Sequence, residues 1–345
     1  MNVAMNVSMN VSTNPPINPP TTLQLKLFMN RIIFFVLLFV SNLCFGAYPN
    51  GPLKMIVPFP AGGPTDVIAR LVSTKLGEAL GQSVFIENKA GAHGAIGMQA
   101  ALAAPADGQT LVMVSIGTNG INPGLYKKMA YDVNKDFVPV SLLITVPIVI
   151  VTKADAPFDD LAGLINYAKT NPGKLTFASA GNGGSSHLVP EMFMHRSGID
   201  MVHIPYKGTA PAITDVLAGQ VNLMFDTLLT STQHIQSGKL KVIATTTAKR
   251  LPAYPNTPTV EESGFPGFEA SSWYGLTVKA GTSPEIIKRI STELAKIMKM
   301  ADVKSRLDQL STVSVGSTPE EFAKFQKAEQ DKWAKVIQKG NIQPE

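Results

Sequence analysis

The chain has 345 residues, 45% of them apolar, and a formal charge of +5, which is too small to indicate binding to nucleic acid or to a membrane surface. Its only cysteine, Cys44, lies near the amino terminus, so the chain beyond it has no disulfide, no thiolate ligand and no cysteine nucleophile. A chain of this length and apolar content can bury two hydrophobic cores by packing alone.

The first 46 residues have the organisation of a leader followed by a signal peptide. Arg31 precedes the apolar run 32–40, and small residues at Gly46 and Ala47 mark the expected cleavage point. The apolar run falls short of the roughly 20 residues that a membrane span requires. We therefore expect an exported protein that is cleaved near Gly46 or Ala47.

Residues 1–28 precede Met29, which opens a complete signal peptide and is the expected true start. They contain Met-Asn-Val and Asn-Pro-Pro repeats without a core-forming period, so the alternative is a disordered leader. Whether they are translated stays open. Loss of residues 1–46 removes Lys26, Arg31 and Cys44 and no acidic residue, which lowers the formal charge from +5 to +3.

From residue 48 onward, short apolar strands alternate with helical segments, which is typical of an α/β protein with mainly parallel sheets covered by helices. Strands are predicted at 54–59, 83–87, 110–115, 138–151, 175–179, 201–205, 221–226, 241–246 and 273–278. Helices are predicted at 64–80, 94–104, 158–170, 186–197, 209–218, 228–237, 284–299, 301–309 and 319–339.

Two features favour two lobes over one long sheet. The stretch 137–151 is too long for a typical strand and contains Pro139 and Pro147, which are awkward in a central strand, so we interpret it as a bent crossover. The proline- and glycine-rich segment 250–270 would be the second passage between the lobes. We predict one lobe over 48–143 plus 272–345 and the other over 144–271, with a ligand cleft between them.

Glycine-rich turns follow four of the predicted strands and open onto helices, at 58–66, 116–120, 179–187 and 206–211. In the last of these we expect Thr209 to cap its helix and Gly219 to end it. Free backbone amides at a helix amino terminus bind anions without a basic side chain. One such turn is often only a tight connection, but two in each predicted lobe favour a carboxylate site in the cleft.

Three side chains near these turns have two interpretations each. Asp66 either caps its helix or contacts a ligand through water. Phe59 is either a wall of the cleft or part of the core. Asp226 ends a predicted strand beside Thr227, and if it faces the cleft it would receive an ammonium or hydroxyl donor from the ligand.

The sequence does not favour an enzyme. The segment 181–186 imitates a dinucleotide-binding fingerprint. That fingerprint requires an acidic residue at the end of the next strand, but Asp200 precedes the strand. Ser185, Ser186 and His187 are adjacent and therefore badly placed to face one another, and the chain has no Gly-x-Ser-x-Gly elbow. The 5 histidines show no ligand spacing. We expect no catalysis, no cofactor and no metal ion.

Segments along the chain resemble the tripartite tricarboxylate transporter substrate-binding proteins, also called Bug receptors. They are KMIVPFPAGGPTD at 54–66 with Ala69 and Arg70, ENKAGAHGAIG at 87–97, ADGQTL at 106–111, Tyr131-Asp to Asp136-Phe, HIPYKGTAPA at 203–212, PNTPTVEESGFPGFE at 255–269 and WYGL at 273–276. The likeness runs in order through the chain from residue 48.

The resemblance implies a periplasmic, two-lobed Venus-flytrap fold of the type II-like class that captures a small carboxylated solute. It also implies delivery of the solute to the membrane permease subunits of a tripartite transporter. With the turns, it indicates these ligand-binding residues: Phe59, Ala61, Gly62, Gly63, Asp66, His93, Thr118, Asn119, Ser179, Gly181, Ser185, Ser186, His187, Gly208, Thr209 and Asp226.

Several questions stay open at this point. His93 stands where the family pattern more often has a small residue, so it is either a ligand contact or an exposed turn residue. The alternative function is a sensor that docks on a membrane histidine kinase. Dicarboxylates, amino acids, aromatic acids and nicotinate-like compounds all remain candidate ligands. We expect a monomer, because a receptor that closes and docks has little use for a large oligomeric interface.

Overall fold

The computed structural model describes residues 48–343. The interpretations of the signal peptide, of Met29 as the start and of Cys44 lie outside the described residues. Within residues 48–343, no helix combines the length and apolar composition needed to cross a bilayer.

The first lobe contains three parallel strands in the order β2 (Val84–Asn88), β1 (Leu53–Val57) and β3 (Thr110–Ser115). Helices α2 (Pro64–Leu80) and α3 (Ala95–Leu102) connect them. Most side chains of β1 and β3 are fully buried. Parallel strands covered on both faces are expected to be apolar throughout, and this is why both strands form continuous apolar runs in the sequence.

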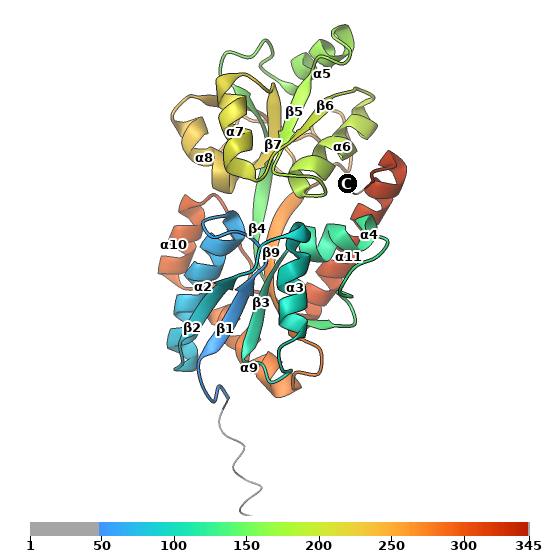
Figure 1. Ribbon diagram of the computed structural model, residues 1–345. Coiled ribbons are helices and arrows are strands. Elements are labelled where there is room, and N and C mark those ends of the chain that lie inside the picture. Colours follow the sequence, from blue (N-terminus) through green and yellow to red (C-terminus); the bar gives the residue numbers. More distant parts are fainter. Residues whose placement is uncertain (1–47, 344–345) are drawn as a thin grey trace, which may run out of the picture. The chain divides into compact units, whose positions relative to one another are not determined.

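Two long strands pass from the first lobe to the second (Figure 1). Strand β4 (Phe137–Lys153) pairs antiparallel with β9 (Ser271–Lys279) over most of the length of β9. Farther along, β4 pairs antiparallel with strands of the second lobe. The register of β4 shifts between Pro139 and Ser141, which accommodates a residue that cannot donate to the ladder. The predicted bent crossover at 137–151 and the returning strand near 273 are confirmed.

The second lobe has the parallel strands β7 (Leu223–Thr227), β5 (Thr176–Ser179) and β6 (Val202–Pro205), with β8 (Leu240–Thr245) antiparallel to β4. Its helices are α5 (Leu161–Thr170), α6 (Ser185–Ser197), α7 (Thr209–Ala218) and α8 (Leu228–Gln236). Strands β5 and β6 each end at a loop that leads into α6 and α7, and β7 runs directly into α8.

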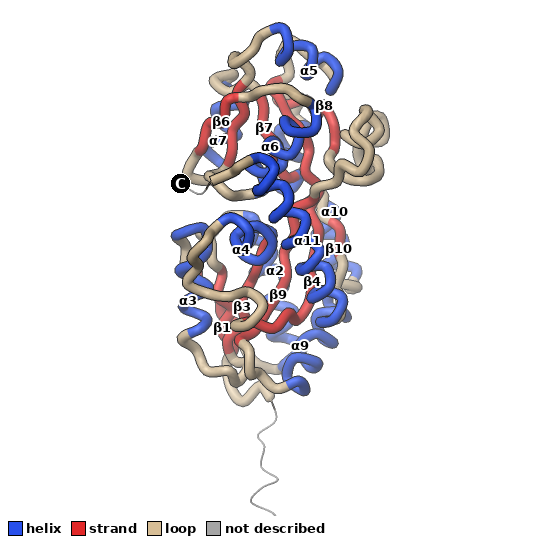
Figure 2. The backbone as a smooth tube through the Cα atoms, turned by 90° about the vertical axis from the view of Figure 1, so that its right-hand side faces the viewer, coloured by secondary structure: helices blue, strands red, loops and turns tan. Residues whose placement is uncertain are grey.

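The carboxyl-terminal part packs onto the first lobe as α9 (Pro284–Ile297), α10 (Ala301–Gln309), the short strand β10 (Val313–Ser314) and α11 (Pro319–Gly340). Figure 2 shows α11 beside β4 and close to α6, in agreement with its contacts to both elements. Phe322 and Trp333 anchor α11, since both side chains are fully buried. Helix α11 therefore contacts the sheet of the first lobe and a helix of the second.

The predicted helices and strands match the structure within a few residues, and the two-lobed fold is confirmed. The sheets are mixed: strands within each lobe run parallel, while the pairs formed by β4 and β9 are antiparallel. Four short elements were not predicted, namely β10, the 3-10 turn η1 (Ala92–Gly94), the π-helix η2 (Ile116–Ile121) and α4 (Asn122–Leu125). The residue numbers that bound the lobes stay a prediction.

Candidate functional site

The turn between β1 and α2 is held by the carboxylate of Asp66. This side chain is 2% exposed, and its two oxygens accept hydrogen bonds from Gly62 N (2.9 Å), Asn88 Nδ2 (3.0 Å) and Arg70 Nε (2.8 Å) and Nη2 (3.1 Å). Asn88 Nδ2 also donates to the carbonyl oxygen of Phe59. Asp66 therefore ties both ends of the turn to the first turn of α2.

Burial acts to raise the pKa of Asp66, but the hydrogen bonds from Arg70, Gly62 and Asn88 outweigh it and lower the pKa below its usual value. The carboxylate is ionised at neutral pH and is already satisfied by protein donors. This arrangement supports the predicted helix-terminal role of Asp66. A water-mediated contact to a ligand stays a prediction, as do the contacts of Phe59, Ala61, Gly62 and Gly63.

The other turns of the first lobe gather around Gly94. A Cβ on Gly94 would lie 2.6 Å from Thr118 Cγ2 and 3.6 Å from Phe59 Cζ, so the turn that carries His93 lies against two of the predicted site residues. Asn122 Nδ2 donates to the carbonyl oxygen of His93. The His93 side chain is exposed, and its ring centroid is 5.9 Å from that of Tyr126.

Thr118 and Asn119, which we predicted as ligand contacts, direct their side chains to partners inside the protein. Thr118 Oγ1 accepts from Ser115 N at 3.1 Å and closes the start of η2. Asn119 Nδ2 donates to Gln326 Oε1 at 2.9 Å, and Gln330 Nε2 donates to the Asn119 carbonyl oxygen. Both side chains thus fix the π-helix against its surroundings, and any contact with a ligand stays a prediction.

In the second lobe, the loop between β5 and α6 is folded by its own side chains. Ser186 Oγ accepts from Ala180 N (3.0 Å), Ser179 Oγ accepts from Gly181 N (3.2 Å) and His187 Nδ1 accepts from Gly183 N (3.1 Å). The N–H groups of Ser185 and Ser186 at the start of α6 have no intrahelical acceptor, whereas His187 N donates to the Gly184 carbonyl oxygen at 3.0 Å. The loop is therefore rigidly built around an open helix amino terminus.

The neighbouring turn before α7 is attached to this loop, because Gly208 N donates to the Ala180 carbonyl oxygen at 3.1 Å. Our prediction that Thr209 caps α7 is wrong. The N-cap is Gly208, whose φ of 115° suits glycine, and Thr209 is the first helical residue. Gly219 ends the helix in the left-handed conformation, as predicted. The turns that precede α6 and α7 are thus joined by a backbone hydrogen bond.

The aromatic rings of Phe177, His187 and His203 stack against one another next to the loop between β5 and α6. The His203 ring lies 4.0 Å from the His187 ring and 4.8 Å from the Phe177 ring, centroid to centroid, with interplanar angles of 9° and 14°. Ser179 Oγ lies 2.6 Å from His203 Nε2. Burial, together with the nearby His187, lowers the pKa of His203 to about 4. His203 is therefore neutral over most of the pH range in which proteins function.

Asp226 is the penultimate residue of β7 and has an exposed fraction of 3%. Its Oδ2 accepts hydrogen bonds from Thr230 Oγ1 at 2.6 Å and from Ser231 Oγ, both in the first turns of α8. Burial raises the pKa of Asp226, and the hydrogen bonds from Ser231 and Thr230 act against this. These two hydroxyl donors tie Asp226 to the start of α8, whose N-cap is Thr227, and the predicted contact with a ligand donor stays a prediction.

The loop of the second lobe touches the first lobe at Gly183. A Cβ there would lie 2.6 Å from Leu125 Cδ2 and 3.7 Å from the Tyr126 hydroxyl. Tyr126 is also the neighbour of His93. Leu125 and Tyr126 therefore lie next to Gly183 of the second lobe, and Tyr126 also lies next to His93 of the first.

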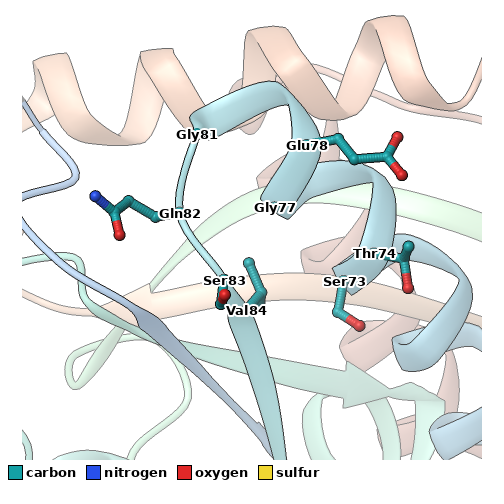
Figure 3. A pocket seen from close by; sticks show the side chains of 8 residues that line it. All are labelled: Ser73, Thr74, Gly77, Glu78, Gly81, Gln82, Ser83 and Val84. Atoms are coloured by element: carbon teal, nitrogen blue, oxygen red, sulfur yellow. The ribbon is translucent and has the colours of Figure 1, made fainter.

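One surface hollow lies away from these turns, and a second includes Tyr126 in its lining. Figure 3 shows the first, around the end of α2 and the start of β2, with a volume of about 450 Å³; its lining is Ser73, Thr74, Gly77, Glu78, Gly81, Gln82, Ser83 and Val84. The second, of about 580 Å³, is lined by residues between Pro123 and Asp136. Neither lining includes a predicted site residue. Within residues 48–343, no group of three or more His, Cys, Asp or Glu is placed to hold a metal ion.

Sequence reasoning missed Asn88, Tyr126 and His203 as parts of this region. Asn88 and His203 lie in the segments that carry the family resemblance, and their positions at strand ends beside a glycine-rich turn were an available signal. Tyr126 gave no signal, because its place depends on the unpredicted elements η2 and α4.

Comparison with known proteins gives a consistent result. The family described as "Tripartite tricarboxylate transporter family receptor" matches residues 68–342. The periplasmic binding protein BugD is 36% identical, with a TM-score of 0.78 over 86% of this chain and 100% of that one.

Two further solved structures contain carboxylates. Rpa4515 of R. palustris with adipate is 33% identical, with a TM-score of 0.81 over 86% of this chain and 100% of that one. MatC of Rhodopseudomonas palustris with bound malate is 31% identical, with a TM-score of 0.77 over 84% of this chain and 100% of that one.

Proposed function

The chain belongs to the tripartite tricarboxylate transporter family of receptors, and from this premise we propose that it captures a small organic acid between its two lobes. The observation that carries the proposal is that the turns at the amino termini of α6 and α7 are joined by the hydrogen bond from Gly208 N to the Ala180 carbonyl oxygen. A third amino terminus, that of α2, opens at the Asp66 turn of the other lobe.

Backbone donors at helix termini favour a carboxylate, because unpaired N–H groups and the helix dipole both attract negative charge. The one arginine at the Asp66 turn, Arg70, is paired with Asp66. A carboxylate held here would be bound mainly by amides, and the adipate and malate of the two related structures are ligands of this chemical class.

We further propose that the mature chain works in the periplasm as a monomer and passes its ligand unchanged to membrane permease subunits. The family description and the periplasmic relative support the location and the transport partner. The absence of catalysis is supported by the placement of the reactive side chains: Ser186 Oγ and His187 Nδ1 both accept backbone N–H groups of their own loop.

The test is a thermal-shift screen of residues 47–345 against organic acids, each paired with its neutral amide, such as adipate with adipamide. A ligand at a hundred times its dissociation constant adds about 2.7 kcal/mol to the free energy of unfolding and raises the melting temperature. We expect stabilisation by one or more acids and none by the amides. Equal stabilisation by both members of a pair would contradict carboxylate recognition, and chemical conversion of a bound acid, followed by NMR, would contradict the receptor role.

A further inference from the structure

His187 lies in the first turn of α6 with both ring nitrogens directed at protein atoms. Its Nδ1 accepts the Gly183 N–H at 3.1 Å, and its Nε2 lies 3.6 Å from Glu191 Oε1 on the next turn of the same helix. Only an unprotonated Nδ1 can accept this hydrogen bond. The side chain is therefore engaged with its own loop and helix, and neither nitrogen is directed at a ligand.

The ring of His187 is fixed in this orientation by its stack on His203. The two rings are nearly parallel at 4.0 Å, and the Phe177 ring also stacks on His203, at 4.8 Å. His203 is also held through its Nε2 by Ser179, the residue that begins the loop. Two imidazoles this close cannot both carry a charge without strong repulsion, so the stack is stable only with at least one neutral ring.

The hydrogen bond to His187 sets the shape of the loop. Gly183 has a φ of 75° and lies against Leu125 of the first lobe, and the first-turn amides of α6 follow it directly. Protonation of His187 Nδ1 would place an N–H opposite the Gly183 N–H. Two donors cannot share a hydrogen bond, so the loop would have to move away from this position.

We propose that His187 is a positioning residue: its neutral ring holds Gly183 and thereby presents the amino terminus of α6 to the ligand, and protonation of Nδ1 releases the loop and weakens binding. The proposal rests on the proposed function, since the ligand it refers to is the carboxylate bound at that terminus. The titratable groups that face His187 are Glu191 on its own helix and His203 on β6, and Tyr126 faces Gly183 from the first lobe.

Three variants separate the acceptor from the ring. His187→Asn keeps an oxygen acceptor near the position of Nδ1 and cannot be protonated. His187→Phe keeps a ring to stack on His203 and has no acceptor. His195→Asn is the matched control, because His195 is an exposed histidine in the last turn of the same helix.

Adipate and malate are titrated calorimetrically into each variant at about pH 8 and about pH 5, on either side of the range in which histidine generally changes charge. We expect the wild type and His195→Asn to bind about tenfold more weakly at the lower pH. His187→Asn should bind within about threefold of the wild type at the higher pH and show a smaller pH dependence than the wild type, because only the protonation of the acid itself remains. His187→Phe should bind about three to ten times more weakly than the wild type at the higher pH and should stay weak at the lower one, because the hydrogen bond to the Gly183 N–H is lost.

An affinity of the wild type that rises on acidification would mean that His187 supplies charge to the ligand, and it would overturn the positioning role. So would a pH dependence of binding in His187→Asn that is as large as that of the wild type. A second measurement needs no ligand: nitrogen NMR of the ring should show an unprotonated Nδ1 at about pH 8, and the Gly183 amide signal should titrate with the ring. If neither acid binds the wild type, the proposed function is wrong for these acids, while the NMR result still decides whether His187 holds the loop.

Discussion

Replacing Asp66 by asparagine tests whether the turn before α2 depends on a carboxylate. The two oxygens of Asp66 accept four hydrogen bonds, from Gly62, Asn88 and twice from Arg70. Asparagine keeps one oxygen and places an NH2 group against the remaining donors. Arg70 is 57% exposed and regains water, but Gly62 or Asn88 loses a partner in a partly buried site. At about 1.5–3 kcal/mol for a hydrogen bond to a charged group, the expected loss of stability is about 2–3 kcal/mol.

Urea unfolding of the mature protein at neutral pH measures this loss, with Asp107→Asn as the matched control. Asp107 is an exposed carboxylate that accepts a single backbone N–H, from Gln109, and its replacement should cost less than about 1 kcal/mol. Equal stability of Asp66→Asn and the wild type would refute the reasoning. Folding lowers the pKa of Asp66, so the ionised carboxylate contributes fully to stability above the pKa of the unfolded chain, near 4. This contribution is lost as the pH falls through the pKa of the folded protein. The stabilities of Asp66→Asn and the wild type should therefore converge in acid.

Two further predictions concern the attachment of α11. A Cβ on Gly275 would come within 2.7 Å of Phe322 Cε1, so Gly275→Ala should lower the free energy of unfolding in urea by about 1–3 kcal/mol. Adding Phe322→Leu to the same chain should restore part of this loss. Absence of any rescue would contradict a steric cause. Glu329 Oε2 accepts the indole N–H groups of both tryptophans, Trp273 at 3.0 Å and Trp333 at 3.1 Å. Glu329→Ala should therefore cost about 2–4 kcal/mol and change the tryptophan emission spectrum, and an unchanged spectrum would contradict the shared acceptor.

The arrangement of strands and helices was predictable because the apolar periods are strong and the turns carry glycine and proline. The crossover was readable from the length of the apolar run, but the expectation from Pro139 and Pro147 was misleading, because β4 is one continuous strand between β9 and β7 whose register shifts after Pro139. The π-helix at Ile116–Ile121 was not readable. Its conformation depends on Thr118 closing onto Ser115 and on Asn119 bonding to α11, and Gln326 is 207 residues away in the sequence.

The location of the site was likewise more predictable than the roles of its side chains. Glycine-rich turns at strand ends mark where backbone donors gather, and the structure places the turns at 179–187 and 206–211 together. Which way a polar side chain points depends on neighbours that a single sequence does not reveal. Asp226 was predicted beside the cleft, and the structure gives it hydroxyl partners from the helix that follows it.

These side-chain roles have a consequence for selectivity. Asp66, Ser179, Ser186 and His187 all have hydrogen bonds to the backbone of their own loops, so in the proposed site a carboxylate meets main-chain amides. Main-chain donors distinguish an acid from its amide but are indifferent to the rest of the molecule. Discrimination between acids therefore has to come from the shape of the space between the lobes. Tyr126, which lies beside Gly183, is the side chain placed to limit that space, and replacing it should change which acid is preferred more than whether an acid is bound.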